Sequence, residues 1–251
     1  MAPDAARDGP GQDGLAQDGA TGALLQAHGI AAERLEAPFA LWLVRAGQEG
    51  DRRALAACLG PAERARAERF GPERLAHRYR AAHAALRLLV QARFGIDAGR
   101  QDYGANAHGK PFLRGAPEVQ CNISYSGDFA LVAVGTGRQI GIDLERVRPV
   151  ADAAQLAFAH YTDREIAGLA AHAGAGAAAA LDRAFLTVWV RKEACSKALG
   201  KGLSIPPSSF ECGLGCGLRN VLIEGEIVES VVSDPKGGLL MSWARRGPGV
   251  N

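Results

Sequence analysis

The protein has 251 residues, enough for one sizeable hydrophobic core or two modest ones, and 47% of them are hydrophobic. Its formal net charge of +2 gives no strong overall field that would draw it to nucleic acid or to a membrane. No stretch is long and apolar enough to span a bilayer, and the N-terminus lacks a signal-peptide pattern. The five cysteines are odd in number and scattered, which favours reduced thiols. We therefore expect a cytoplasmic monomer without nucleic-acid or membrane partners.

The N-terminal region predicts little regular structure. Residues 1–36 are rich in Ala, Gly, Asp and Gln, so we expect a disordered or mobile tail, with a helical piece around residues 24–35. A strand-like run at residues 39–44 is expected to open the ordered domain.

Two helices are predicted next, at residues 61–70 and 73–94, with Gly95 as the stop of the second. The second helix carries Arg78, Arg80 and Arg87 on its less apolar face. A solvated helix face is the favoured interpretation for most of these arginines. Contact of one or more of them with an anionic ligand is the alternative.

The middle of the chain predicts three strands joined by glycine turns, at residues 119–125, 129–134 and 140–144. Thr162 and Glu165 then form a capping box that opens a helix. The main helix of the second half is expected over residues 181–199, ended by Gly200 or Gly202.

Short strands alternating with glycine turns are predicted from Phe210 onward. Helices and strands are therefore grouped rather than strictly alternating, which indicates an α+β fold. We divide the ordered part into an N-terminal half, residues 37–139, and a C-terminal half, residues 140–251.

Two carboxylates are spaced as on one face of a strand in the run Ile140-Gly141-Ile142-Asp143-Leu144-Glu145. Side chains alternate along a strand, so the isoleucines and the leucine would enter a core while Asp143 and Glu145 share the opposite, exposed face. Such carboxylates repel each other unless a cation lies between them, and hard oxygen ligands suit magnesium. Taken alone, this pair fits an ordinary solvated strand better than a metal site.

A carboxylate and a lysine follow helical spacing in the second half, where Trp189, Glu193 and Lys197 lie four residues apart along one stripe. Taken alone, Glu193 and Lys197 would be a surface ion pair of little energetic value. The functional interpretation makes Glu193 a metal ligand or a general base. Lys197 would then hold a phosphate oxygen, with Lys192 nearby for added charge.

Two weaker motifs offer phosphate-binding groups. Gly104-x4-Gly109-Lys110 resembles a P-loop, but Pro111 stands where the metal-binding hydroxyl should be, so only the lysine of Gly109-Lys110-Pro111 is kept as a ligand. The run 122–127 ends a strand with hydroxyls and a glycine turn, which can bind phosphate or simply close a hairpin.

These motifs, in this order, resemble the 4′-phosphopantetheinyl transferase family, specifically its longer, surfactin-synthetase-activating type. The resemblance covers Leu41 to Phe210 and is strongest at residues 140–145 and in Trp189-x-x-Lys192-Glu193-Ala194-x-x-Lys197. It implies a pseudo-dimer of two similar α+β halves with the active site in the cleft between them. It also implies a magnesium-dependent transfer of the phosphopantetheine arm of coenzyme A to a serine of an apo carrier protein, with release of adenosine 3′,5′-bisphosphate.

The same resemblance implies a role for each motif residue. Asp143, Glu145 and Glu193 would bind Mg²⁺ with the pyrophosphate of coenzyme A, and Glu193, directly or through a metal-bound water, would take the serine proton. Phosphate oxygens would be bound by four residues, namely Lys197, Lys110, Ser124 and, at the 3′-phosphate, Arg78.

Tyr125 departs from the family pattern, which usually has histidine at this position. A tyrosine hydroxyl can donate a hydrogen bond to a phosphate oxygen but brings no positive charge. This departure motivates a second hypothesis, a relative that binds coenzyme A without catalysis. A third, a magnesium-dependent phosphodiester hydrolase using the same carboxylates, is disfavoured by the lysines of the helix.

Overall fold

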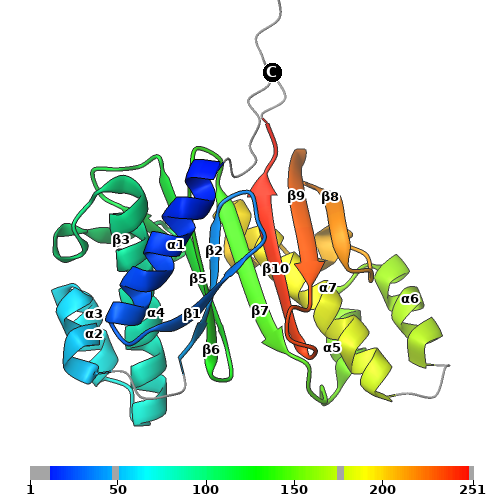
Figure 1. The fold of residues 1–251 in the computed structure, drawn as a ribbon. Coiled ribbons are helices and arrows are strands. Elements are labelled where there is room, and N and C mark those ends of the chain that lie inside the picture. The colour runs from blue at the N-terminus through cyan, green and yellow to red at the C-terminus, as the bar shows by residue number, and fades with distance from the viewer. Residues whose placement is uncertain (1–11, 47–50, 174–177, 249–251) are drawn as a thin grey trace, which may run out of the picture.

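The computed structural model describes residues 12–46, 51–173 and 178–248, and within them the fold is α+β, as predicted (Figure 1). The first half contains α1 (Gln12–Ala27), β1 (Ala31–Leu35), β2 (Ala40–Arg45), α2 (Arg52–Cys58), α3 (Pro61–Glu68), α4 (Glu73–Phe94), β3 (Tyr103–Ala105), β4 (Pro111–Leu113), β5 (Val119–Ser126) and β6 (Phe129–Thr136). The second half contains β7 (Ile140–Arg146), α5 (Ala153–His160), α6 (Asp163–Ala173), α7 (Ala178–Ala198), β8 (Gly217–Ile223), β9 (Glu226–Ser233) and β10 (Leu239–Arg246). Short 3-10 turns complete the connections.

Each half is built around an antiparallel sheet, in the order β1-β2-β6-β5 in the first and β7-β10-β9-β8 in the second. In both halves a strand is followed by helices and then by a meander whose last strand pairs with that first strand, β6 with β2 and β10 with β7. A long helix packs on each sheet, α4 on the first and α7 on the second (Figure 1). Among the described helices, none is long and apolar enough to cross a membrane.

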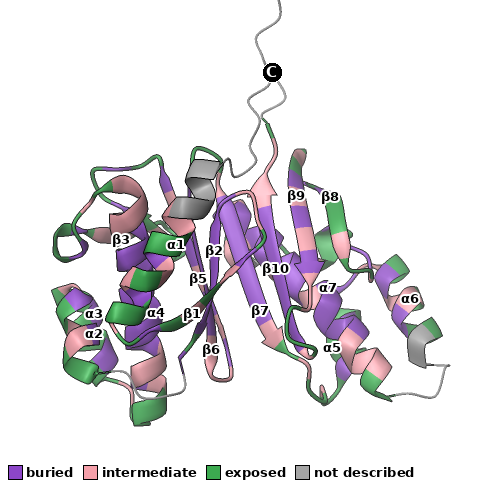
Figure 2. Cartoon of the chain, viewed as in Figure 1, coloured by how far each residue is buried: buried purple, intermediate pink, exposed green. Residues whose placement is uncertain are grey.

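The two sheets pack against each other and leave their outer faces to the helices. Alternation along β2 turns Trp42 and Val44 toward α4 and Leu41 and Leu43 toward the second sheet. Apolar residues of β7 and β10 in the second sheet pack against them, namely Ile140, Ile142, Leu144, Met241 and Trp243. Figure 2 shows this buried layer running through the middle of the molecule.

We predicted a disordered or mobile tail at residues 1–36, but from residue 12 onward this segment forms a helix and a strand. Residues 1–11 lie outside the described part of the chain. Helix α1 brings Leu25 into the first hydrophobic core, and Ile30 follows it there. Strand β1 pairs antiparallel with β2 at the edge of the first sheet. Composition misled here because the segment is stabilised by the packing of α1 on α4 and by the pairing of β1 with β2 rather than by its own propensity.

Strands β5 and β7 bring the two predicted halves together, because each is an edge strand of its own sheet and they lie next to each other. The strands expected at 119–125, 129–134 and 140–144 are all present, as is the glycine stop after α4, where Gly95 has φ of 67°. Polar residues of β5 and β7 face each other along this junction, which we call the seam.

Candidate active site at the seam

Side chains of β5 bridge the seam at every second residue. The Asn122 amide oxygen accepts a hydrogen bond from the Ile142 backbone N–H, at 2.9 Å. The Ser124 hydroxyl donates to Asp143 Oδ1 at 2.7 Å, and the Ser126 hydroxyl donates to Glu145 Oε2 at 3.1 Å. The period of two along β5 therefore places both serine hydroxyls against the two carboxylates predicted from the sequence.

Helix α7 lies directly over the carboxylate face of β7, and Gly141 allows this approach. A Cβ at Gly141 would lie 2.1 Å from the carbonyl oxygen of Ala194 and 2.3 Å from the backbone nitrogen of Ala198. The residues before these alanines are Glu193 and Lys197, so the close contact sets both beside Asp143. The face expected to be exposed is thus covered, and Asp143 is only 6% exposed.

Lys197 is the cation at the centre of this group. Its Nζ lies 2.6 Å from Asp143 Oδ1 and 3.7 Å from Glu193 Oε2. Burial alone would lower the pKa of Lys197, but the charges of Asp143 and Glu193 outweigh it and the pKa is raised. Lys197 therefore remains an ammonium group at neutral pH.

The carboxylates of the seam carry more negative charge than one lysine compensates. Burial raises the pKa of Glu145, and repulsion from Asp143 raises it further, against the hydrogen bond from Ser126. Burial also raises the pKa of Glu193, where attraction to Lys197 opposes the effect and the charge of Asp143 adds to it. A further cation would relieve this repulsion.

The donor set fits a hard divalent cation, although its present arrangement is organised around Lys197. Within the described residues, no group of three or more His, Cys, Asp or Glu side chains is gathered as a ready-made metal site. Asp143, Glu145 and Glu193 nevertheless influence one another electrostatically and offer only carboxylate oxygens.

Tyr125 lies on the other face of β5, toward α4, because it follows Ser124 directly in the strand. The Arg78 guanidinium stacks over the Tyr125 ring at 5.1 Å from its centroid and donates to the Gly127 carbonyl oxygen at 2.7 Å. The Tyr125 hydroxyl is buried without a hydrogen-bond partner in the described structure. Burial raises the pKa of Tyr125, so the hydroxyl keeps its proton.

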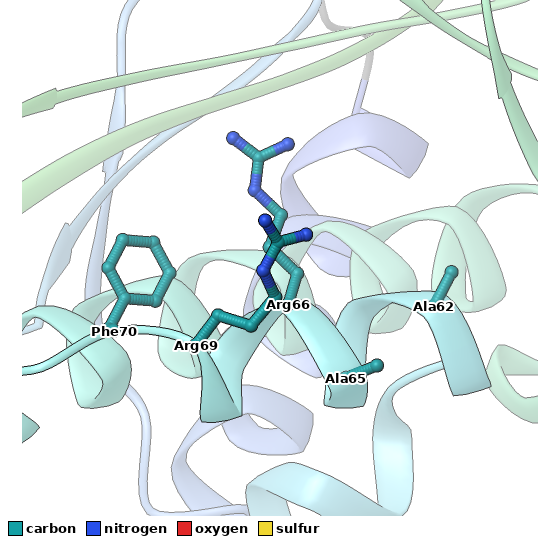
Figure 3. Close-up of a pocket in the computed structure, with 5 residues that line it drawn as sticks. All are labelled: Ala62, Ala65, Arg66, Arg69 and Phe70. Atoms are coloured by element: carbon teal, nitrogen blue, oxygen red, sulfur yellow. The ribbon is translucent and has the colours of Figure 1, made fainter.

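A pocket of about 600 Å³ opens on the same side of the molecule, lined by Ala62, Ala65, Arg66, Arg69 and Phe70 of α3 and the turn after it (Figure 3). The Arg66 guanidinium lies 5.7 Å from the centroid of the Tyr79 ring, and Arg66 also acts electrostatically on Tyr125. No ion pair is recorded for Arg66 or Arg69 in the described part of the chain. The other face of β5 is therefore cationic.

Lys110 reaches the start of β7. Its Nζ donates to the Ile140 carbonyl oxygen at 2.9 Å, three residues before Asp143. Burial lowers the pKa of Lys110 to about 8, since no carboxylate compensates the cost of burying the ammonium group. A bound anion would supply the missing partner.

Comparisons with known proteins agree with this geometry. The family model described as the 4′-phosphopantetheinyl transferase superfamily matches residues 139–225, which include β7 and α7. The 4′-phosphopantetheinyl transferase HetI of Nostoc sp. is 34% identical over 168 residues, or 65% of this chain and 69% of the relative. A 4′-phosphopantetheinyl transferase of Bacillus subtilis is 28% identical over 179 residues, 70% and 75% of the two chains. The chain belongs to the 4′-phosphopantetheinyl transferase family.

Membership of the transferase family makes the protein an enzyme and confirms the resemblance seen in its motifs. A third relative, the 4′-phosphopantetheinyl transferase Sfp of Bacillus subtilis strain 168, is 27% identical over 161 residues, covering 62% of this chain and 66% of the relative.

Lys192 was predicted as a site residue, but its side chain lies away from the seam. Its Nζ forms an ion pair with Glu165 at 2.8 Å and donates to the carbonyl oxygens of Pro207 and Phe210. Lys192 is 1% exposed and Glu165 is fully buried. The prediction that Lys192 adds charge for coenzyme A is wrong, because the helix turns its side chain into the core of the second half.

Two arginines of α4 are also buried rather than solvated. Arg80 pairs with Glu73 and Arg87 with Glu63, at 2.7 and 2.6 Å. Arg78 is thus the member of that predicted group that contacts β5, through Tyr125 and Gly127, on the face away from the seam.

The sequence did not predict the bridging role of Asn122 and Ser126. Nor did it predict that Arg66 and Arg69 are the cations of the pocket. Asn122 and Ser126 lie two residues before and after Ser124, so strand alternation could have predicted that they share its face. The second pair is spaced i, i+3 on a helix, a pattern too common on surfaces to indicate a site.

Proposed function

We propose that the protein transfers the 4′-phosphopantetheine arm of coenzyme A to a serine of an apo carrier protein, with Mg²⁺, and releases adenosine 3′,5′-bisphosphate. The observation that carries the proposal is the group at the seam, where Lys197 pairs with Asp143 and Glu193. The hydroxyls of Ser124 and Ser126 donate there to Asp143 and Glu145. Such a group can hold a metal and a pyrophosphate against each other.

The transfer is a displacement at the β-phosphorus of coenzyme A. The acceptor serine oxygen forms a bond to that phosphorus, and the bond from the phosphorus to the bridging oxygen breaks. The bridging oxygen leaves with its electron pair on adenosine 3′,5′-bisphosphate. Glu193, directly or through a metal-bound water, takes the serine proton.

Asp143, Glu145 and Glu193 would hold the Mg²⁺. The ion supplies positive charge that stabilises the oxygens of the pyrophosphate during displacement. Lys197 contacts Asp143 and Glu193 in the present arrangement, and in the proposed function its ammonium group binds a phosphate oxygen instead.

The cationic face of β5 would bind the other end of coenzyme A. We assign the 3′-phosphate to Arg78, assisted by Arg66 and Arg69 of the neighbouring pocket, because these guanidinium groups lie on the side of Tyr125 away from the carboxylates. The unpartnered Tyr125 hydroxyl can donate to a phosphate oxygen there, and Lys110 binds the pyrophosphate.

Tyr125 is also the observation that favours a second function, a coenzyme A-binding protein without transferase activity. Neutral tyrosine supplies one hydrogen-bond donor where the family usually has a histidine that can carry charge. Both functions predict binding of coenzyme A, and only the first predicts a modified carrier.

The test is the intact mass of apo carrier proteins after incubation with the protein, coenzyme A and Mg²⁺. A panel of apo acyl, polyketide and peptidyl carriers is used, and at least one is expected to gain the mass of one phosphopantetheine. Tight coenzyme A binding with every carrier unmodified would support the binding protein instead. Breakdown of coenzyme A without a carrier would support a hydrolase.

A further inference from the structure

The hairpin of β3 and β4 carries Lys110 from the first half to the second. It has three residues in each strand, and a ribbon of this size is marginally stable at best by itself. Leu113 anchors its inner end in the first hydrophobic core. The turn at its outer end, residues 106–110, is exposed apart from Lys110, so the core does not fix its position. Hydrogen bonds must therefore hold this turn in place beside the second half.

Asn106 makes hydrogen bonds with both ends of its side-chain amide. Its Oδ1 accepts from the backbone N–H groups of His108 and Lys110, both at 2.9 Å, and these two bonds close the turn. Its Nδ2 donates to the carbonyl oxygen of Gly200 at 2.7 Å. One end of the amide therefore shapes the turn, and the other end links the turn to the end of α7 in the second half.

Gly200 is the residue of the second half that the turn contacts. It follows α7 in the left-handed conformation, with φ of 71°, and its N–H donates to the carbonyl oxygen of Lys197 at 3.0 Å. An added Cβ at Gly200 would lie 3.4 Å from Asn106 Nδ2 and 3.7 Å from Cδ of Lys110. Gly200 thus lies against the side chain of Lys110 and is hydrogen-bonded to the backbone of Lys197.

We propose that Asn106 is a positioning residue for coenzyme A, which fastens the turn carrying Lys110 to the end of the helix carrying Lys197. The inference rests on the proposed function, in which both lysines bind the pyrophosphate. The two lysines come from different halves of the protein, so their separation depends on contacts between the halves. Asn122 fixes β7 against β5, and Asn106 fixes the hairpin against α7. A small displacement of one ligand-binding group is enough to weaken binding at such a site.

The exposure of Asn106 allows a substitution that does not disturb the core. Replacement by alanine leaves no internal cavity, and water can reach the backbone groups that lose their partner. The melting temperature should therefore stay at the wild-type value. A loss of affinity for coenzyme A would then report the position of Lys110 rather than unfolding.

The experiment compares the wild type with Asn106→Ala, Asn106→Ser and His108→Ala, by calorimetric binding of coenzyme A and by steady-state transfer to apo acyl carrier protein. Asn106→Ala should raise the Kd and KM for coenzyme A about fivefold, as expected for the loss of one or two hydrogen bonds, and leave the KM for the carrier unchanged. Asn106→Ser should share this loss, because its hydroxyl can close the turn but is too short to reach Gly200. His108→Ala is the matched control, since this exposed residue of the same turn contributes its backbone N–H and should match the wild type.

Proton uptake distinguishes positioning from a merely structural role. Burial lowers the pKa of Lys110 to about 8, so at pH 9 the wild type must take up a proton when the pyrophosphate binds. The Cys121 thiol also acts on Lys110, but burial raises the pKa of Cys121 to about 12, so the thiol stays neutral at pH 9. In Asn106→Ala the released Lys110 is already protonated at pH 9. Proton uptake, measured in two buffers of different ionisation enthalpy, should therefore fall by at least half.

Failure of the role of Asn106 and failure of the proposed function give different results. Equal affinity and equal proton uptake in Asn106→Ala and His108→Ala overturn the positioning role, as does a lower melting temperature with both KM values raised alike. Wild-type affinity in Asn106→Ser overturns the link to α7. A wild type that binds coenzyme A but modifies no carrier overturns the proposed function, while the binding measurements still decide the role of Asn106.

Discussion

The two faces of strand β5 differ in charge, although neighbouring residues supply them. Ser124 and Ser126 face the acidic seam and donate to Asp143 and Glu145. Tyr125, between them, faces the arginines of α3 and α4. Strand alternation thus separates a carboxylate group from a cationic group by the thickness of one strand.

The two faces also differ in how their charges are compensated. The carboxylates of the seam are held by hydroxyls and by Lys197, and Asp143 is buried. Arg66 and Arg69 are exposed and have no recorded ion pair in the described residues. The acidic face is therefore preorganised for chemistry, whereas the cationic face has free donors for an anion. Substitutions on each face should accordingly affect different measurements.

Glu193→Gln is the substitution with the largest expected effect, because it removes the proton acceptor while keeping the size of the side chain. We expect kcat for carrier modification to fall by a factor on the order of 10² to 10⁴. The Kd for coenzyme A without added metal should change by less than about threefold, since the cationic face is untouched. Single-turnover transfer and calorimetric binding measure the two quantities.

Lys201→Ala is the control for this substitution, because Lys201 lies outside the seam in an exposed ion pair with Glu224. Its removal should leave transfer within about twofold of the wild type, as for most surface pairs. Full turnover by Glu193→Gln would show that the acidic face does not supply the base, and the division between the two faces would have to be abandoned.

Arg66→Ala tests the cationic face and should act on binding rather than on chemistry. Loss of one guanidinium contact to a phosphate should raise the Kd for coenzyme A about tenfold, with kcat at saturation preserved. Dephospho-coenzyme A, which lacks the 3′-phosphate, should bind wild type and variant alike. Arg114→Ala is the matched control, since Arg114 is an exposed arginine of the first half that pairs with Asp102 instead. If Arg66→Ala weakened the binding of coenzyme A and dephospho-coenzyme A equally, Arg66 would not contact the 3′-phosphate.

Local patterns in the sequence predicted the parts of the site that depend on period. Alternation in β7 placed Ile142 in the core and Asp143 opposite. The four-residue spacing in α7 paired Glu193 with Lys197, which also pairs with Asp143. Lys192 was predicted to join the site because it is next to Glu193 in sequence. Adjacent residues of a helix point about 100° apart, so Lys192 lies on a different face of α7 from Glu193.

Long-range contacts account for what the sequence could not supply. The buried partner of Lys192 is Glu165 of the preceding helix, whose capping-box spacing gave no sign of an ion pair. The cationic face depends on α3 packing near Tyr125. None of these contacts follows from a repeat or a motif, because each is fixed by tertiary packing.

The smallest expected effect is a pH dependence of coenzyme A binding that comes from Lys110. This lysine is a buried cation, and no carboxylate among the described residues offsets the cost of its burial. Burial lowers its pKa to about 8, and a bound phosphate should raise the pKa again. Below pH 8 the ammonium group is already present and affinity should be flat. Above pH 8 binding must take up a proton, so affinity for coenzyme A should fall by at most tenfold per pH unit.

Calorimetric titration of coenzyme A between about pH 7 and pH 9, in two buffers of different ionisation enthalpy, measures both the affinity and the proton uptake. Lys110→Met should bind more weakly at pH 7 and take up no proton at pH 9, whereas Lys201→Met should retain the wild-type profile. A wild-type affinity that is constant from pH 7 to pH 9 would contradict the role of Lys110. The pyrophosphate would then be bound by Lys197 alone, whose pKa is raised rather than lowered by its surroundings, so that its charge persists throughout this range.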